Sequence, residues 1–275
     1  MLYGEGIGEA MSATRRRFLL YSAFGLVSAG IGATGYSNTI RTQIEPDKIS
    51  IKIDGLPASF RGLTIAQLSD MHSSSLSSNE LIENGAKAVM AEKPDVIALT
   101  GDFITGFWKF KRKYLDRLVE AFGSLSAPMG IYAVPGNHDF WAGPDALKLI
   151  VDEFSSKLGV VWLRNRHIML NKGGEKIALL GVNDYYHTWW IRAAYKGLDH
   201  DTIKILLSHN PDINTKVEPH MRIDLILSGH THGGQVVAPI IGAPWTPCET
   251  GQKYRAGLVR DGERQTYISR GLGQT

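Results

Sequence analysis

The sequence predicts an α/β fold, and two patterns lead to this prediction. As far as Asp139, short apolar runs alternate with segments of helical period, which implies adjacent and largely parallel strands. From Val160 onwards, apolar runs follow one another closely around a tight turn at 172–175, which indicates a second, more antiparallel sheet. The chain has 275 residues and is 43% hydrophobic, so it has enough apolar material for a packed core.

The first half is expected to begin with an edge strand at 49–53, where apolar and polar residues alternate before a turn at 54–57. Buried strands are expected at 63–68, 95–100 and 131–135. The segment Ser77-Ser78-Asn79 provides N-cap residues for a helix that runs to Met90. Two further helices are predicted at 112–122 and 144–158.

The second half is expected to contain mainly strands. Apolar runs at 160–163, 167–170 and 176–180 predict three of them in close succession. Further buried strands are expected at 203–207 and 223–227. The runs 256–259 and 265–269 flank Arg260-Asp261-Gly262-Glu263, which predicts a hairpin.

Polar clusters follow five of these apolar runs, and they contain residue types that bind divalent metals. They are Asp70-Met71-His72, Gly101-Asp102, Gly136-Asn137-His138-Asp139, Ser208-His209 and Gly229-His230-Thr231-His232. Ligands of open α/β sheets bind outside the carboxyl ends of the strands, so we expect the five clusters to converge on one place.

In this order, the five clusters resemble the motifs of the calcineurin-like metallophosphoesterase superfamily, over roughly residues 51–273. Each cluster alone is a weak signal, whereas all five in order are highly specific. The resemblance implies a four-layer α/β/β/α sandwich of two mixed sheets. It also implies a hydrolase of phosphomonoesters or phosphodiesters that works through attack by a hydroxide bridging two metal ions.

The resemblance assigns a role to each polar cluster. One ion would be held by Asp70, His72, Asp102 and His232, and the other by Asp102, Asn137, His209 and His230, so that Asp102 bridges them. Such oxygen and nitrogen ligands suit Mn, Fe or Zn better than Mg or Ca. Two metal ions clamp a phosphoryl group and make hydroxide available at neutral pH, so no further nucleophile is needed.

His138 is adjacent to a ligand, and we expect it to stabilise the transition state or to protonate the leaving oxygen. Asp139 is expected either to orient His138 or to cap the loop through its own backbone contacts. Asp184 is interpreted either as an outer-sphere residue of the site or as a turn aspartate. His167, His187, His200 and His220 match none of the clusters, which favours ordinary surface or hydrogen-bonded histidines.

Residues 1–40 are predicted to form a signal or membrane anchor with a linker, and residues 41–275 the catalytic domain. The run Thr14-Arg15-Arg16-Arg17-Phe18-Leu19-Leu20 resembles a twin-arginine export signal, and no charged residue follows until Arg41. The uncharged span 18–36 is about long enough to cross a bilayer, although its glycines and serines weaken that interpretation. We therefore expect an exported or membrane-tethered enzyme on the periplasmic side.

Composition excludes several other classes of protein. The net charge of +3 is too small to indicate nucleic-acid binding, and no P-loop sequence is present. Cys248 is the only cysteine, so the chain forms no intrachain disulfide and has no thiolate set for a structural zinc. The preferred interpretation of Cys248 is a small, partly buried residue.

Two alternatives to a general phosphoesterase remain at this stage. Some relatives are pyrophosphohydrolases of the UDP-2,3-diacylglucosamine type in envelope lipid synthesis, and others are non-catalytic metal-binding scaffolds. The segments 107–114 and 185–192 combine aromatic and cationic residues, as is typical of the membrane interface. They favour a phospholipid or phosphorylated glycolipid as substrate, unless these rings only pack on each other.

Overall fold

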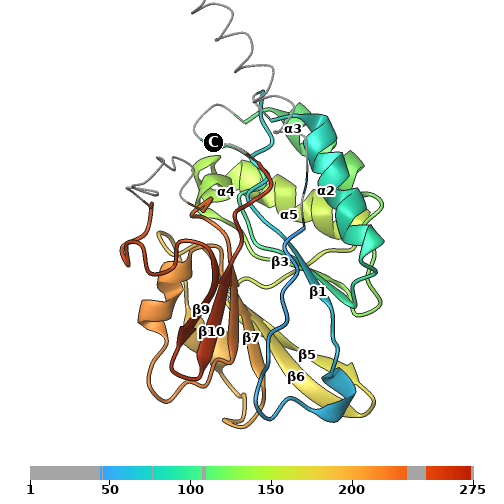
Figure 1. Ribbon diagram of the computed structural model, residues 1–275. Coiled ribbons are helices and arrows are strands. Elements are labelled where there is room, and N and C mark those ends of the chain that lie inside the picture. The colour runs from blue at the N-terminus through green and yellow to red at the C-terminus, as the bar shows by residue number, and fades with distance from the viewer. Residues whose placement is uncertain (1–43, 45, 76, 107–109, 234–245, 274–275) are drawn as a thin grey trace, which may run out of the picture. The chain divides into compact units, whose positions relative to one another are not determined.

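The computed structural model describes residue 44 and the stretches 46–75, 77–106, 110–233 and 246–273 (Figure 1). The predicted signal or anchor at 1–40 lies outside the described residues, and so do residues 107–109 of the first aromatic segment. Among the helices that the structure describes, none is both long enough and apolar enough to cross a membrane.

The first sheet contains four parallel strands in the order β1-β2-β3-β4. These strands are β1 (Ile65–Leu68), β2 (Val96–Leu99), β3 (Ile131–Ala133) and β4 (Val161–Trp162). The predicted alternation of strands and helices is confirmed. The assignment of 160–163 to the second sheet is wrong, because β4 pairs in parallel with β3.

The second sheet has the order β5-β6-β7-β8-β10-β9. Its strands are β5 (Arg166–Lys172), β6 (Glu175–Gly181), β7 (Lys204–Leu207), β8 (Leu225–Ser228), β9 (Gly257–Asp261) and β10 (Arg264–Ile268). The two hairpins at its edges are antiparallel, as predicted. The central pairings β6-β7, β7-β8 and β8-β10 are parallel, so this sheet is mixed, and it is more antiparallel than the first sheet, as predicted.

The three predicted helices are present as α2 (Asn79–Ala91), α3 (Arg112–Phe122) and α5 (Pro144–Leu158). Helix α5 begins with proline at a position that needs no N–H donor, and it ends at Gly159, whose φ of 65° suits a left-handed C-cap. The short elements η1 (Ala58–Phe60), α4 (Asn137–Trp141), α6 (Ile191–Tyr195) and η2 (Pro211–Lys216) were not predicted.

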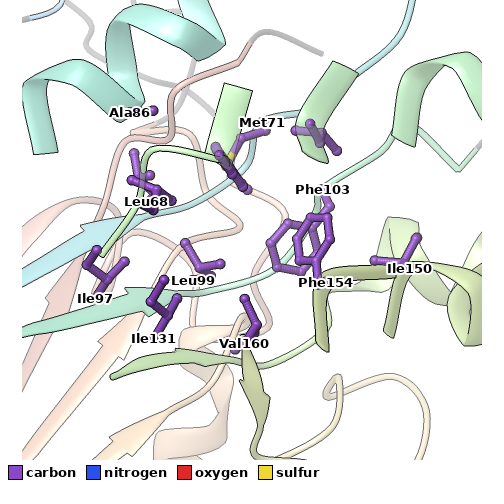
Figure 2. Packing of buried hydrophobic residues seen from close by; sticks show 14 of the residues in the cluster. Leu68, Met71, Ala86, Ile97, Leu99, Phe103, Ile131, Ile150, Phe154 and Val160 are labelled. Atoms are coloured by element: carbon purple, nitrogen blue, oxygen red, sulfur yellow. The ribbon is translucent and has the colours of Figure 1, made fainter. Parts of the chain in front are cut away.

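Alternating side chains of the buried strands divide the core into layers. On β2, Ile97 and Leu99 face α2, α3 and α5, whereas Val96 and Ala98 face the second sheet. Figure 2 shows Ile97 and Leu99 in the helix-covered layer, together with Phe103 and Phe154. A third apolar cluster covers the outer face of the second sheet with residues of α6 and η2. The four-layer α/β/β/α sandwich is therefore confirmed.

The expected edge strand at 49–53 is wrong, because this segment makes no sheet pairing. Ile51 and Ile53 pack against the core between the sheets, and the carbonyl of Lys52 accepts a hydrogen bond from the Gln265 side chain. Burial of every second side chain therefore produces the alternation without a strand.

Candidate metal centre

The five polar clusters converge at the carboxyl ends of strands from both sheets. Asp70 and Asp102 follow β1 and β2, and Asn137 begins α4 after β3. His209 follows β7, and His230 and His232 follow β8. All of these residues are buried except His232, which is partly exposed.

Five of these residues have left-handed backbone conformations. The residues with positive φ are Asp70 (56°), His72 (45°), Asp102 (54°), His230 (73°) and His232 (51°). Among the described non-glycine residues, only Lys93 and Asn165 share this property. Such conformations are sparsely populated and cluster at functional sites, which supports a functional role for this place.

Glycines allow the clusters to approach one another closely. A Cβ atom at Gly136 would lie 2.2 Å from Oδ1 of Asp102, and a Cβ atom at Gly229 would lie 2.1 Å from Oδ2 of Asp70. Neither contact is sterically possible, so a side chain at either glycine would displace a carboxylate of the site.

Apolar residues next to the candidate ligands in the sequence anchor the clusters in the core. Met71 lies between Asp70 and His72, and Phe103 follows Asp102, and both are fully buried. Figure 2 shows them in the apolar cluster with Leu68 and Phe154. The backbone that carries the ligands is thus held by packing on one side while the ligands point to the other.

Within the described part of the chain, potential metal ligands form three groups of closely spaced atoms. Within each group the ligand atoms lie within 4.8 Å of one another, and the groups are Asp70-His72-His232, His72-Asp102-His138 and Asp102-His209-His230. The first and third groups belong to the two predicted ligand sets, each of which also contains Asp102. The structure therefore brings together the residues expected from the sequence.

Close contacts between potential ligand atoms also favour a cation here. The Nε2 atoms of His72 and His232 lie 3.0 Å apart, and Oδ1 of Asp70 lies 3.3 Å from Nε2 of His232. Burial lowers the pKa of His72 well below its ordinary value, which keeps its ring neutral and able to bind a metal.

Hydrogen bonds fix which nitrogens of two histidines face the centre. Nδ1–H of His209 donates to the carbonyl of Thr100 at 2.7 Å, and Nε2–H of His230 donates to the carbonyl of Pro247 at 3.0 Å. The ligand atoms are then Nε2 of His209 and Nδ1 of His230. Such a bond on the remote ring nitrogen is the usual support of a metal-binding histidine.

The charges of the buried carboxylates require compensation. Burial raises the pKa of Asp70. At Asp102, burial also raises the pKa, but His209, His72 and His138 together outweigh burial and lower it. Nε2 of His209 lies 3.1 Å from Oδ2 of Asp102. Burial lowers the pKa of His209, but the charges of Asp102 and Asp70 outweigh burial and raise this pKa to about 10. A divalent cation would compensate the same two carboxylates and leave His209 neutral as a ligand.

An unpaired buried atom also indicates that these residues fit a metal. Oδ1 of Asn137 is buried and has no hydrogen-bond partner. An amide oxygen in this position is an ordinary ligand for a divalent metal, and leaving it unsatisfied costs free energy. The donor set of carboxylates, imidazoles and one amide therefore fits the metals expected from the sequence.

Comparison with known proteins agrees with this geometry. The family model described as calcineurin-like phosphoesterase matches residues 63–234, which is more than half of the chain. The chain belongs to the calcineurin-like phosphoesterase family. It is therefore a metallophosphoesterase, a hydrolase of phosphoric ester bonds.

Three bacterial relatives match almost the whole chain. The chain is 30% identical to the uncharacterized metallophosphoesterase YkuE of Bacillus subtilis, over 96% of this chain and 93% of that protein. It is 30% identical to the uncharacterized metallophosphoesterase YkoQ of Bacillus subtilis, over 87% of each. It is 29% identical to the phosphodiesterase YaeI of Escherichia coli, over 94% of this chain and 92% of that protein.

His138 lies beside the potential ligand His72 in this metallophosphoesterase, with the ring centroids 4.6 Å apart. Its Nδ1 accepts a hydrogen bond from the backbone N–H of Gly106 at 3.2 Å, which places the proton of the neutral ring on Nε2. Burial lowers the pKa of His138, which favours this neutral form.

Asp139 binds backbone amides of the loop that carries Asp102. Its carboxylate accepts the N–H groups of Asp102 (3.0 Å), Phe103 (2.9 Å), Ile104 (3.4 Å) and Gly136 (2.8 Å). Burial and the charge of Asp102 raise the pKa of Asp139, while these donors favour the ionised form. Of the two predicted roles, the contacts favour loop capping, so Asp139 positions Asp102 rather than the ring of His138.

The weaker candidates have local partners. Asp184 accepts the N–H of Tyr186 at 3.0 Å and pairs with Nδ1 of His187 at 2.7 Å, as a turn aspartate does. The ring of His167 pairs with the carbonyl of Ala194. His200 and His220 lie beside Asp201 and Glu218 respectively. The interpretation of these four histidines as hydrogen-bonded or surface residues agrees with the structure.

Several contributors to the site were missed by the sequence reasoning. The N–H groups of Leu272 and Gly273 donate to the carbonyls of Ser69 and Asp70, at 2.9 and 2.7 Å, so the C-terminal segment holds the first cluster in place. Pro247 supports His230 through its carbonyl. Only the glycines at 271 and 273 gave a signal for such a close approach, and nothing in the sequence indicated Pro247.

Proposed function

We propose that this metallophosphoesterase is a dinuclear phosphodiesterase. The two ligand sets would be Asp70, His72, Asp102 and His232 for one ion and Asp102, Asn137, His209 and His230 for the other. The observation that supports two ions is the presence of Asp102 between His72 (3.5 Å) and His209 (3.1 Å), which belong to different sets. The donor types favour Mn, Fe or Zn.

When bound, such ions would neutralise the charge of the phosphoryl oxygens and supply hydroxide at neutral pH. The protein contributes a rigid arrangement of ligands, because Asp139 fixes the loop of Asp102 and backbone carbonyls orient His209 and His230. Because Nδ1 of His138 accepts the Gly106 N–H, the neutral ring carries its proton on Nε2. Nε2–H can then donate to a phosphoryl oxygen or to the leaving oxygen.

Preference for a diester is supported by the relative YaeI, which is named a phosphodiesterase. A second observation supports it, because an open pocket adjoins His230 and leaves room for a second ester group. The test is hydrolysis of bis-(p-nitrophenyl) phosphate and p-nitrophenyl phosphate by the metal-reconstituted protein. We expect kcat/KM to be higher for the diester, and faster cleavage of the monoester would contradict the proposal.

We further propose that the enzyme is exported or membrane-tethered and acts on a phospholipid or phosphorylated glycolipid. The arginine run at 15–17 and the uncharged segment that follows it support export. In the second aromatic segment, Trp190 is 65% exposed, which suits contact with an interface. Tyr185 instead stacks on Trp189 with the rings 6.2 Å apart, so this pair serves packing.

Vesicle sedimentation tests the membrane proposal. A protein that lacks residues 1–40 is expected to bind anionic vesicles at low salt, and Trp108→Ala with Trp190→Ala is expected to weaken binding while hydrolysis of a small soluble diester continues. Failure of the shortened protein to sediment with vesicles would exclude the lipid substrate and favour a soluble diester.

A further inference from the structure

An open pocket of about 440 Å³ lies directly beside the metal centre. It is lined by Trp141 of α4, by Tyr186 of the segment between β6 and α6, by His230, and by residues 246–249. Because His230 is also a member of the metal-ligand group with Asp102 and His209, the pocket is continuous with the proposed reacting centre.

Two aromatic side chains form walls of this pocket, and both are unusually exposed for their size. Trp141 is 44% exposed and Tyr186 is 46% exposed. The ring of Trp141 lies 4.7 Å from that of His138, and the ring of Tyr186 lies 5.9 Å from that of His230. Exposed ring surface therefore flanks the two histidines that would face a bound phosphate.

The Tyr186 wall is held in place by hydrogen bonding and packing. Its hydroxyl donates to the carbonyl of Pro247 at 3.0 Å, which is the carbonyl that also orients His230. The ring of Tyr185 packs edge-on against it at 5.6 Å. Burial and nearby Asp212 raise the pKa of Tyr186 to about 12, which keeps the phenol protonated as a donor. Because the Tyr186 side chain is already held in place, it loses little conformational entropy when a ring binds against it.

The charge of the pocket disfavours a second anionic group. Of the described residues that line it, none is Lys or Arg, and Glu249 contributes a carboxylate. The carboxylate of Asp212 lies just behind, where it accepts the N–H groups of Glu249 and Thr250. A pyrophosphate or a second phosphate would meet negative charge here, whereas a neutral group would not.

We propose that this pocket binds one ester group of the substrate and that Trp141 and Tyr186 select a phosphodiester in which this group carries a flat, uncharged ring. The inference rests on the proposed phosphodiesterase function and specifies the class of soluble diester that is the alternative to a lipid substrate. Ring faces at the walls favour stacked or edge-on contact with another ring, and the absence of cationic partners among the described lining residues favours a neutral one.

Phosphonates test the proposal without hydrolysis, because they carry a single substituent and do not turn over. Binding of phenylphosphonate, cyclohexylphosphonate and methylphosphonate to the Mn-loaded full-length protein is measured by calorimetry. We expect phenylphosphonate to bind about 3- to 10-fold more tightly than the other two. Trp141→Leu is expected to abolish this preference, Trp141→Phe to retain most of it, and Ile49→Ala, which changes an exposed residue outside the pocket, to leave it unchanged.

Two outcomes would overturn this inference without contradicting the proposed phosphodiesterase function. Equal binding of phenyl and cyclohexyl compounds would remove the preference for a flat ring, and an unchanged preference in Trp141→Leu would remove the role of this pocket. Circular dichroism and metal content establish that each variant is folded and loaded. Failure of the proposed function is distinguishable, because the wild-type protein would then fail to cleave bis-(p-nitrophenyl) phosphate with any metal.

Discussion

His230 and Tyr186 donate hydrogen bonds to the same acceptor, the carbonyl oxygen of Pro247, each at 3.0 Å. A carbonyl oxygen has two lone pairs, so it can accept both donors. One backbone group therefore sets the orientation of a proposed metal ligand and the position of a pocket wall. Displacement of the 246–249 segment is expected to affect metal binding and substrate recognition together.

Replacing Asp102 with alanine is expected to reduce metal content and activity together, because Asp102 belongs to both proposed ligand sets. Turnover should fall by more than about 100-fold, which is the upper range for loss of an outer-sphere partner. His232→Ala is the matched comparison, because His232 belongs to one set and its loss should leave one ion bound. Metal analysis after dialysis gives the stoichiometry. Two ions per chain with near wild-type turnover in Asp102→Ala would contradict the bridging role.

Replacing His138 with alanine is expected to retain the metals and lower kcat by about 10²- to 10⁴-fold, which is the usual contribution of general acid catalysis. The loss should be smaller for nitrophenyl esters than for alkyl esters, since a good leaving group needs little protonation. Steady-state kinetics with both kinds of ester make the comparison. An equal loss for the two would leave transition-state charge stabilisation as the only role of His138.

Replacing Asp139 with alanine is expected to lower the free energy of unfolding by at least about 2 kcal/mol, because buried backbone N–H groups lose their acceptor. Asp139→Asn retains one acceptor oxygen and should lose roughly half as much. Urea unfolding of the metal-free proteins measures both effects. Stability equal to wild type in Asp139→Ala would show that water replaces the carboxylate without cost.

The thiol of Cys248 is expected to react slowly with a disulfide reagent at pH 8. Burial, together with Asp212 and Glu249, raises its pKa above the ordinary value, so less of it is thiolate at this pH. The rate should be at least about tenfold higher after unfolding in urea. In the folded protein the rate should rise about tenfold between pH 9 and pH 10, because both values lie below the raised pKa. A rise of only about twofold or less over this interval would indicate an ordinary thiol.

The convergence of the candidate site residues could be predicted because each follows an apolar run, and parallel strands of one sheet end at a common edge. Asp70, Asp102 and His209 lie where this rule places them, directly after β1, β2 and β7. Helix α5 could likewise be bounded, because Pro144 and Gly159 mark its two ends.

Other features depend on contacts that sequence patterns do not encode. The two-residue strand β4 carries no signal for the sheet it joins, and its pairing with β3 decides the matter. The pocket brings together Trp141, Tyr186 and the 246–249 segment, which are separated by tens of residues. Asp139 looks like a partner of its neighbour His138, yet its hydrogen bonds reach the loop around Asp102.

The left-handed backbone at five residues of the candidate site implies a trade-off between stability and function. Each such conformation costs about 1 kcal/mol or more in a non-glycine residue, and in the metal-free protein no metal-binding free energy offsets this cost. Substitution of His232 by glycine should therefore relieve strain and raise the melting temperature of the metal-free protein, even as it destroys the site. Selection for a stable fold and selection for a working enzyme would act in opposite directions at this position.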